Sequence, residues 1–346
     1  MQTLPAGWFQ IGWSHEVQRG DVRPLRFFGE DLVLCRYESG EIGLFDAYCP
    51  HMNANIGFGG ATVGDTLVCP YHGWRFDRAG CNTLIPYSDR LNRSKGLRVW
   101  NVQEVGRSII LAWYSPDESS PTFDPPDTSA LPGLGDPAFY EIGPSSSRHY
   151  ANLPMQVDFV SENTVDMSHF KFVHETPEIG TMLQLDPIDH RLRVQFSMPM
   201  KLYRSDGGGG IEDAVTEVTN WGLGLIMGQF ADGSVLLQAQ TPVDDTLCDL
   251  MLTMVLPRND SETTEPTGNQ LARIKMAWRQ VENDIVIWTH RRRGSKTRPI
   301  AEEVAAFKTF ATWKRQFYLP TSNGSEGELV NTPSGQGSRS QSEVGS

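Results

Sequence analysis

The sequence predicts an α+β protein in which an N-terminal all-β domain precedes a domain built from an antiparallel sheet with covering helices. The first region contains short apolar segments between glycine-rich turns, a pattern typical of antiparallel strands. Strand-like alternation of apolar and polar residues returns at 192–198, 235–240 and 247–256. Helical patterns cover 155–174, 271–290 and 300–316. Helices that precede and follow a run of strands favour an α+β domain.

Length and composition indicate a globular protein of two domains. The chain has 346 residues, 39% of them hydrophobic and 21% charged, which is ordinary for a folded protein. The net charge of −12 offers no basic surface for a phosphate backbone, so no nucleic-acid partner is expected. No leader pattern opens the chain and no run of about 18 apolar residues occurs. We expect a cytoplasmic protein without a membrane span.

A paired-loop metal motif stands in the N-terminal region. Cys49 and His51 are followed, after seventeen residues, by Cys69 and His72, giving the pattern C-x-H-x17-C-x-x-H. Two thiolates and two imidazoles suit either a tetrahedral zinc ion or a [2Fe–2S] cluster, and spacing alone leaves both open. Strand patterns at 32–35 and 42–45, separated by a turn at 38–41, predict a small antiparallel sheet carrying these loops.

The residues around the four ligands resemble the Rieske signature. The matching runs are Tyr48-Cys49-Pro50-His51 and Cys69-Pro70-Tyr71-His72-Gly73-Trp74. The resemblance implies a [2Fe–2S] cluster held by Cys49, His51, Cys69 and His72. Neutral histidine ligands raise the potential of such a cluster to roughly −150 to +300 mV, which suits an electron relay. Cys35 and Cys81 lie outside the pattern and are expected to be small buried thiols.

Composition divides the chain into four segments. Residues 5–115 are expected to form the Rieske domain, and the stretch 116–137, rich in Pro, Ser and Asp, a linker. Residues 138–318 should form the catalytic domain. The tail 319–346, rich in Ser, Gly and Gln, is expected to be disordered.

A second candidate metal site lies at 162–175. Asp166 and His169 are three residues apart and share one face of a helix. His174 lies about 140° around a regular helix from His169, so both rings can meet one ion only if the helix is distorted or ends between them. The pattern N-x-x-D-x-x-H-x4-H, beginning at Asn163, resembles the mononuclear iron site of Rieske-type oxygenases. That resemblance implies Fe(II) held by His169, His174 and a distant carboxylate, and it marks Asn163 as a further site residue.

The third ligand is sought in the predicted helix 271–290. Trp278, Val281, Ile285 and Trp288 mark its core side, and Glu282 and Asp284 lie at opposite flanks, about equally far from the centre of that side. Geometry does not separate the two acids. In the resembled family the ligand is typically an Asp in a segment similar to Asn283-Asp284-Ile285-Val286-Ile287-Trp288, which selects Asp284 and leaves Glu282 as the fallback.

The resemblance also implies how the two centres communicate. An aspartate at the position of Asp166 accepts a hydrogen bond from an iron-binding histidine and, across a subunit boundary, from the exposed cluster histidine, here His72. It would thereby serve as an inter-subunit electron-transfer bridge. A head-to-tail homotrimer and a helix-grip catalytic domain are further implications.

The implied function is that of the terminal oxygenase component of a multicomponent Rieske monooxygenase. It would use O2 and two electrons drawn from NAD(P)H through a ferredoxin or flavin reductase. The segments 162–170 and 284–288 resemble most the branch of 3-ketosteroid 9α-hydroxylases and cholesterol 7-desaturases, which suggests a steroid-like or terpenoid substrate. Desaturation, O- or N-demethylation and aromatic hydroxylation at the same iron stay open, and a pure electron carrier is the alternative of another class.

Two further segments are open to two interpretations each. The four glycines at 207–210 fit a mobile lid or, more simply, a flexible loop. The apolar stretch 221–228 fits either the wall of a hydrophobic pocket or ordinary strand core.

Overall fold

The N-terminal half of the molecule is built from small antiparallel sheets. The computed structural model describes residues 4–203, 210–259, 263–294 and 297–318. The strands are β1 (Gly7–Trp13), β2 (Val22–Phe27), β3 (Glu30–Arg36), β4 (Ile42–Asp46), β5 (Ala61–Val63), β6 (Thr66–Val68), β7 (Arg75–Phe76), β8 (Asn82–Leu84), β9 (Val102–Val105) and β10 (Ile109–Tyr114). They form the sheets β1-β10-β9, β2-β3-β4 and β5-β6-β7-β8. The strands predicted at 32–35 and 42–45 are β3 and β4, which pair antiparallel.

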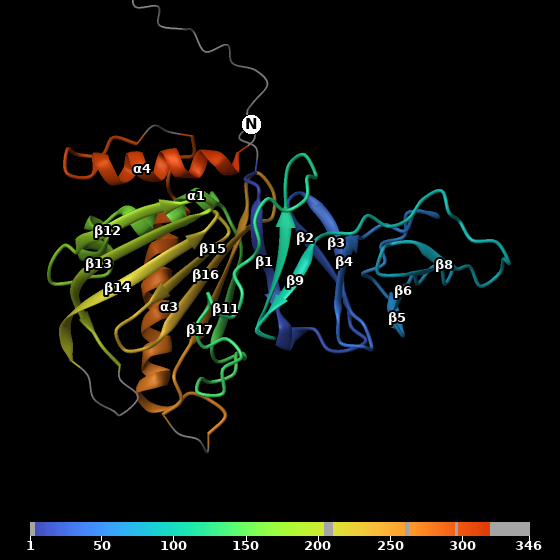
Figure 1. Cartoon of the computed structure of the whole chain (residues 1–346), viewed down its shortest axis with the longest axis horizontal. Helices are drawn as coiled ribbons and strands as arrows, with labels where there is room; N and C mark the ends of the chain where they lie inside the picture. Colours follow the sequence, from blue (N-terminus) through green and yellow to red (C-terminus); the bar gives the residue numbers. More distant parts are fainter. Residues whose placement is uncertain (1–3, 204–209, 260–262, 295–296, 319–346) are drawn as a thin grey trace, which may run out of the picture.

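The second half contains one large antiparallel sheet covered by helices. Its strands are β11 (Ser147–Leu153), β12 (Thr181–Ile188), β13 (Arg191–Lys201), β14 (Ile211–Trp221), β15 (Leu225–Gln229), β16 (Val235–Pro242) and β17 (Cys248–Val255). Their order in the sheet is β11-β17-β16-β15-β14-β13-β12. The long helix α3 (Gly268–Trp288) crosses one face, and α4 (Val304–Lys314) lies at one end of the sheet near α1 (Val157–Glu162) (Figure 1). The predicted α+β class is confirmed.

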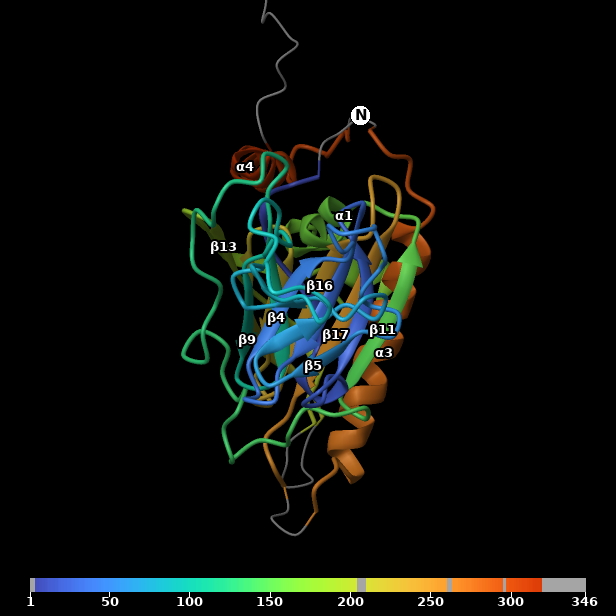
Figure 2. The same cartoon turned by 90° about the vertical axis from the view of Figure 1, so that its right-hand side faces the viewer.

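Both faces of the large sheet are buried, against different partners. Alternate residues of a strand point to opposite faces, so β16 and β17 contribute to two cores. Leu237 and Ala239 pack with Trp8 and Phe9 of β1, whereas Leu236 belongs to the core under α3. Figure 2 shows the N-terminal strands in front of β16 and β17. The N-terminal sheet β1-β10-β9 therefore covers the face of the large sheet opposite α3.

The helix predicted over 155–174 is interrupted, which corrects that expectation. It consists of α1, a 3-10 turn at Asn163–Val165 and α2 (Ser168–Val173). Between them Asp166 adopts an extended conformation, with φ −97° and ψ 96°. Its carboxylate Oδ1 accepts the backbone N–H groups of Ser168 and His169, at 3.1 and 3.2 Å. A short acidic side chain that bonds to nearby N–H groups competes with helical hydrogen bonding and starts a new helix.

Some predicted segments have no regular structure or lie outside the described residues. Residues 116–137 contain neither helix nor strand. The first three of the four glycines at 207–210 lie outside the described residues, and so does the tail 319–346. The carbonyl of Gly210 accepts a hydrogen bond from the backbone N–H of Leu202. In the described ranges, no helix combines the length and apolar character needed to cross a membrane.

Candidate active site

The two cysteine loops have nearly the same backbone design. The N–H of Cys49 donates to the carbonyl of Ala54, and that of Cys69 to the carbonyl of Trp74, each at 2.9 Å. Each loop reverses at the fourth residue after the cysteine, where Asn53 has φ 54° and Gly73 has φ 70°. Glycine enters this left-handed region without steric cost, and asparagine tolerates it better than most residues. Two matched reversals thus present the two Cys-His pairs side by side.

The four side chains all lie between the two loops. The rings of His51 and His72 have centroids 4.6 Å apart, and His51 stacks on Trp74 with an interplanar angle of 7°. Cys49 and Cys69 are buried. Burial raises the pKa of the Cys49 thiol to about 11, so a bound cation is needed to keep it as a thiolate at neutral pH.

This donor set fits a two-iron cluster better than a single zinc ion. In the described part of the chain, one group of three acidic, histidine or cysteine residues has its donor atoms within 4.8 Å of one another. That group is His169, His174 and Asp284. The four loop residues form no such group, although tetrahedral zinc requires its ligands close around one point. The Nδ1 atom of His51 is buried without a hydrogen-bond partner, as expected of a ligand atom.

The two cysteines outside the motif differ from each other. Cys35 is fully buried on β3, and burial raises the pKa of its thiol to about 11, as expected of an inert core residue. Cys81 is exposed, which corrects the expectation that it would be buried. It lies in the turn between β7 and β8, where its backbone N–H donates to Asp77 and its side chain points away from the core.

The interrupted helix brings two histidines together. His169 lies in the first turn of α2, and His174 is the residue at which α2 ends, with φ −105° and ψ 3°. Their ring centroids are 5.1 Å apart. The sequence allowed both rings to meet one ion only if the helix ended between them or was distorted, and α2 ends at His174.

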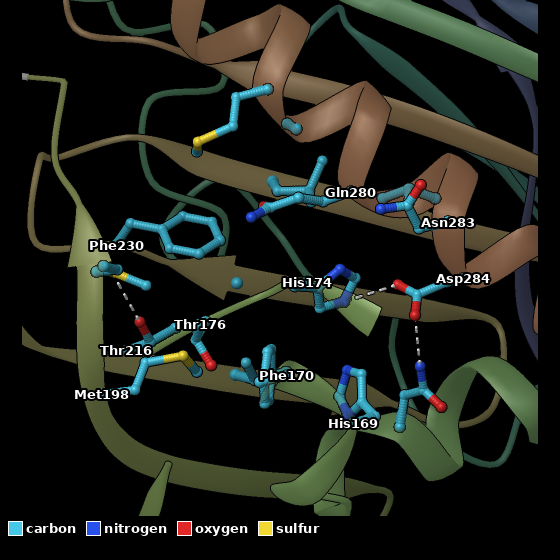
Figure 3. A pocket seen from close by; sticks show the side chains of 18 of the residues that line it. His169, Phe170, His174, Thr176, Met198, Thr216, Phe230, Gln280, Asn283 and Asp284 are labelled. Atoms are coloured by element: carbon cyan, nitrogen blue, oxygen red, sulfur yellow. Dashed lines mark hydrogen bonds and ion pairs between the residues drawn. The ribbon is translucent and has the colours of Figure 1, made fainter. Parts of the chain in front are cut away.

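Helix α3 supplies the carboxylate. Asp284 is 7% exposed, and its Oδ2 lies 3.2 Å from Nε2 of His174. Asn163 donates from Nδ2 to Oδ1 of Asp284 at 3.2 Å and fixes its orientation. Figure 3 shows His169, His174 and Asp284 facing one another between α3 and the α2 segment. We refer to these three residues as the His-His-Asp group.

Glu282 is held elsewhere, so the structure separates two acids that the helical wheel left equivalent. Its Oε1 forms an ion pair with Arg148 at 3.0 Å and accepts a hydrogen bond from the Tyr150 hydroxyl at 2.8 Å. Both partners belong to β11, at the edge of the sheet, and the Glu282 side chain is 42% exposed. A carboxylate occupied in this way is not available to the two histidines.

The ring of His169 is oriented by the backbone of Asp166. Its Nδ1 pairs with the carbonyl oxygen of Asp166, an arrangement that leaves Nε2 with a free lone pair. Burial lowers the pKa of His169, which favours the neutral ring that a metal ion requires. The expectation that the Asp166 carboxylate contacts this ring is corrected, because that carboxylate caps α2 and the carbonyl contacts the ring instead.

A cavity of about 390 Å³ opens from the His-His-Asp group. Its size falls within the range of small-molecule sites. The apolar part of its wall includes Phe170, Phe196, Met198, Ile226 and Leu236. Figure 3 shows Phe170 and Met198 below the cavity and Phe230 at the end away from Asp284.

The strand stretch 221–228 contributes to both of its predicted roles. Ile226 and Gly228 line the cavity, whereas Leu225 and Met227 pack in the core shared with the N-terminal strands. Sequence reasoning missed the cavity residues on β13, Phe196 and Met198, although the alternation of that strand already divided it into two faces.

Comparison with known protein families gives two matches that cover most of the chain. Residues 7–100 match the model described as Rieske [2Fe-2S] domain. Residues 112–318 match the model described as 3-Ketosteroid 9alpha-hydroxylase C-terminal domain, which is more than half of the chain.

Curated relatives agree with these matches, and a solved structure shares the fold. Cholesterol 7-desaturase nvd 1 of Ciona intestinalis is 35% identical over 172 residues, half of this chain and 35% of that protein. The oxygenase component of 3-ketosteroid-9-alpha-monooxygenase of Rhodococcus rhodochrous is 31% identical over 176 residues, half of this chain and 44% of that protein. The chain thus matches about a third to a half of the length of these two relatives. The crystal structure of dicamba monooxygenase bound to dicamba has a TM-score of 0.66 at 17% identity, covering 91% of this chain and 99% of that one.

Proposed function

Because the chain belongs to the 3-ketosteroid 9α-hydroxylase family of Rieske oxygenases, we propose that it is the terminal oxygenase component of a monooxygenase acting on a hydrophobic, steroid-like or terpenoid compound. The observation that carries the proposal is the His-His-Asp group at the end of a largely apolar cavity, in a chain that also has a Rieske domain. An electron carrier would need the Rieske domain alone.

In this proposal His169, His174 and Asp284 would hold a mononuclear Fe(II), which would supply the activation of O2. The chain's own residues orient the three ligands and shield the site from water. Asn163 fixes one oxygen of Asp284, and the Asp166 carbonyl fixes the ring of His169. Phe170 and Met198 border the same space and exclude water from it.

Cys49, His51, Cys69 and His72 are the proposed ligands of the [2Fe–2S] cluster. The stacking of His51 on Trp74 and the burial of both cysteines limit solvent access to this site, and solvent exposure is one of the factors that set a cluster potential. His72 is less enclosed than the cysteines and lies beside the exposed ring of Tyr71. His51 is likewise half-buried but stacks on Trp74, so His72, beside an exposed ring, is the ligand that we propose passes an electron outward.

We propose that the electron reaches the iron of a second copy of the chain. Within one chain the cluster loops adjoin β5 and β6, at the end of the molecule remote from α3 (Figure 1). Exposed apolar side chains lie near both ends of the proposed path: Met52, Phe58, Tyr71 and Tyr87 beside the cluster loops, and Phe172 and Ile287 beside the His-His-Asp group. Exposed apolar clusters of this kind mark interaction sites.

A head-to-tail homotrimer would bring the cluster of each copy to the iron site of the next, because heterologous contacts that close on themselves form a ring. The carboxylate of Asp166 is the proposed bridge to His72 of the neighbouring copy. It is half-buried and borders a second cavity of about 360 Å³ that His169, Ile287 and Arg291 also line. A ferredoxin or flavin reductase drawing on NAD(P)H is the proposed source of the two electrons.

The test is substrate-dependent O2 consumption by the reconstituted protein with NADH or NADPH and a ferredoxin reductase pair. Steroids and aromatic compounds are screened, and products from 18O-labelled O2 are identified by mass spectrometry. Incorporation of one labelled oxygen atom into a steroid supports the proposal. The absence of O2 consumption with every compound, in protein with both centres loaded, would contradict it.

Desaturation is the second candidate, because a cholesterol 7-desaturase is among the relatives. The same assay separates the outcomes by product. Desaturation removes two hydrogen atoms without adding oxygen, and demethylation releases a methyl group as formaldehyde. Aromatic hydroxylation inserts labelled oxygen as hydroxylation of a steroid does, so it is recognised by the compound that reacts.

A further inference from the structure

The cavity ends, opposite the His-His-Asp group, at a buried ion pair. Arg273, Ala277, Gln280 and Asp284 line it from α3, so one side of this helix runs along the whole cavity. Arg273 precedes Asp284 by eleven residues, or about 16 Å along a helix axis. Its guanidinium carbon lies 4.4 Å from the ring centroid of Phe230, which Figure 3 shows at the far end of the cavity from Asp284.

The ion pair of Arg273 with Asp232 is almost completely enclosed by protein. The two side chains are 3% and 2% exposed, and Nε of Arg273 lies 3.1 Å from Oδ2 of Asp232. Nε also lies 3.2 Å from the Ser234 hydroxyl oxygen. Both members of the pair line the cavity. A buried pair of this kind needs hydrogen bonds for all its donors and acceptors to offset desolvation.

The acceptors of this pair are occupied, whereas donors remain. Oδ1 of Asp232 accepts from the backbone N–H and the hydroxyl of Ser234, at 3.0 and 2.5 Å. Oδ2 accepts from Arg273 and from the backbone N–H of Tyr203 at 3.4 Å. Within the described ranges, the hydrogen bonds of Arg273 all start from Nε, so its two Nη groups have none. The far end of the cavity therefore offers free hydrogen-bond donors, which a ligand can satisfy only with an acceptor atom.

Charge balance selects the kind of acceptor. Asp232 already neutralises Arg273, so a buried carboxylate at this point would leave one negative charge without a partner. A neutral oxygen, such as that of a ketone or hydroxyl group, satisfies the free donors without adding charge. Between the two ends the wall carries Phe196, Met198, Ile226 and Leu236, which suit a rigid apolar skeleton.

We propose that Arg273, held in place by Asp232, is a substrate-binding residue that donates hydrogen bonds to a neutral acceptor oxygen at the end of a polycyclic substrate remote from the bond that reacts. The inference deepens the proposed function and rests on it. Arg273 and the His-His-Asp group then fix the two ends of the molecule, and the distance between them determines which carbon reaches the metal.

The test measures binding, so that it is independent of turnover. Dissociation constants of 5α-androstan-3-one and 5α-androstane, which differ by one oxygen atom, are measured by equilibrium dialysis with the anaerobic holoenzyme. The variant Arg273→Met with Asp232→Ala removes the donors, adds no new donor and leaves no buried charge alone. The control, Arg193→Met with Glu217→Gln, removes an ion pair that lies on β13 and β14 outside the cavity.

The unchanged enzyme and the control should bind the ketone roughly 10- to 100-fold more tightly than the hydrocarbon, the range for a hydrogen bond to a charged donor. The double variant should bind both equally, with unchanged affinity for the hydrocarbon. An undiminished preference in the double variant, no preference in the unchanged enzyme, or no binding of either compound would overturn the inference.

If the double variant does not fold, Arg273→Lys keeps the charge but loses the guanidinium geometry. It should raise KM for the ketone at least tenfold with little change in kcat, and an unchanged KM would overturn the inference. The two failures give different results. If only the proposed function is wrong, the enzyme binds the ketone preferentially through Arg273 but oxidises no compound.

Discussion

The two candidate metal sites of this protein are assembled in opposite ways. The cluster loops place four ligands within residues 49–72, on turns of small sheets with matched backbone reversals. The His-His-Asp group joins an interrupted helix to a residue 115 positions later on α3. A site formed by adjacent loops is specified by local sequence, whereas a site formed across a domain depends on packing. Removing a ligand of one site should therefore abolish metal binding at that site and leave the other site loaded.

The largest expected effect is that of Cys69→Ser on the cluster loops. Loss of one thiolate should abolish the visible and EPR signals of the cluster and all turnover, while iron at the His-His-Asp group is retained. Cys81→Ser is the matched control, since Cys81 is exposed and lies outside the motif. An intact cluster spectrum in Cys69→Ser would remove this residue from the ligand set.

Asp284→Ala should have the reverse pattern. The cluster signals persist, whereas iron content falls by one atom per chain and turnover is lost, because two histidines alone hold Fe(II) weakly. Glu282→Ala is the control from the same helix, and it should lose only its contacts with Arg148 and Tyr150. Retained turnover in Asp284→Ala, or lost iron in Glu282→Ala, would contradict the assignment.

Asp166→Asn tests the connection between the two regions. An amide oxygen still accepts the N–H groups at the start of α2, and the backbone carbonyl still orients His169, so both centres should remain loaded. Cluster oxidation after addition of substrate and O2 should slow by roughly 10- to 100-fold in single-turnover measurements, the range for loss of an outer-shell partner. Ser168→Ala serves as the control at the same helix start, and an unchanged rate in Asp166→Asn would count against the bridge.

The smallest effect concerns the packing of the N-terminal strands on the large sheet. A Cβ on Gly224 would lie 2.1 Å from the carbonyl oxygen of Trp8, and that oxygen belongs to the backbone of β1. Gly224→Ala should therefore lower the free energy of unfolding by about 1–3 kcal/mol, measured by urea unfolding. Gly143→Ala, where a Cβ meets nothing within 4 Å, should leave it nearly unchanged. Equal unfolding free energies for the two variants would contradict this prediction, because they would mean that β1 moves away from the added methyl group at no cost.

The sequence predicted the fold class because strand alternation and helical periodicity are local properties. The positions of the paired cysteines and histidines were predicted for the same reason. The choice between Glu282 and Asp284 was beyond the helical wheel, because it depends on Arg148 and Tyr150 of a strand more than 130 residues earlier. The break at Asp166 and the exposure of Cys81 depend on side-chain contacts and turn geometry that periodicity does not encode.

The buried pair of Arg273 and Asp232 had no sequence signal at all. The two residues lie 41 positions apart, on α3 and on the turn between β15 and β16. Charged residues at such positions are indistinguishable in sequence from exposed ones. Only the packing of the helix over the sheet identifies them as enclosed.

The most direct test of the account is complementation between two inactive chains. Cys69→Ser and Asp284→Ala chains, carrying different tags, are co-expressed and purified through both tags. If the electron passes between copies, a mixed trimer has one junction in three that joins an intact cluster to an intact iron, and about one third of normal turnover should return. Mixed assemblies that contain both centres but show no turnover would contradict transfer between subunits.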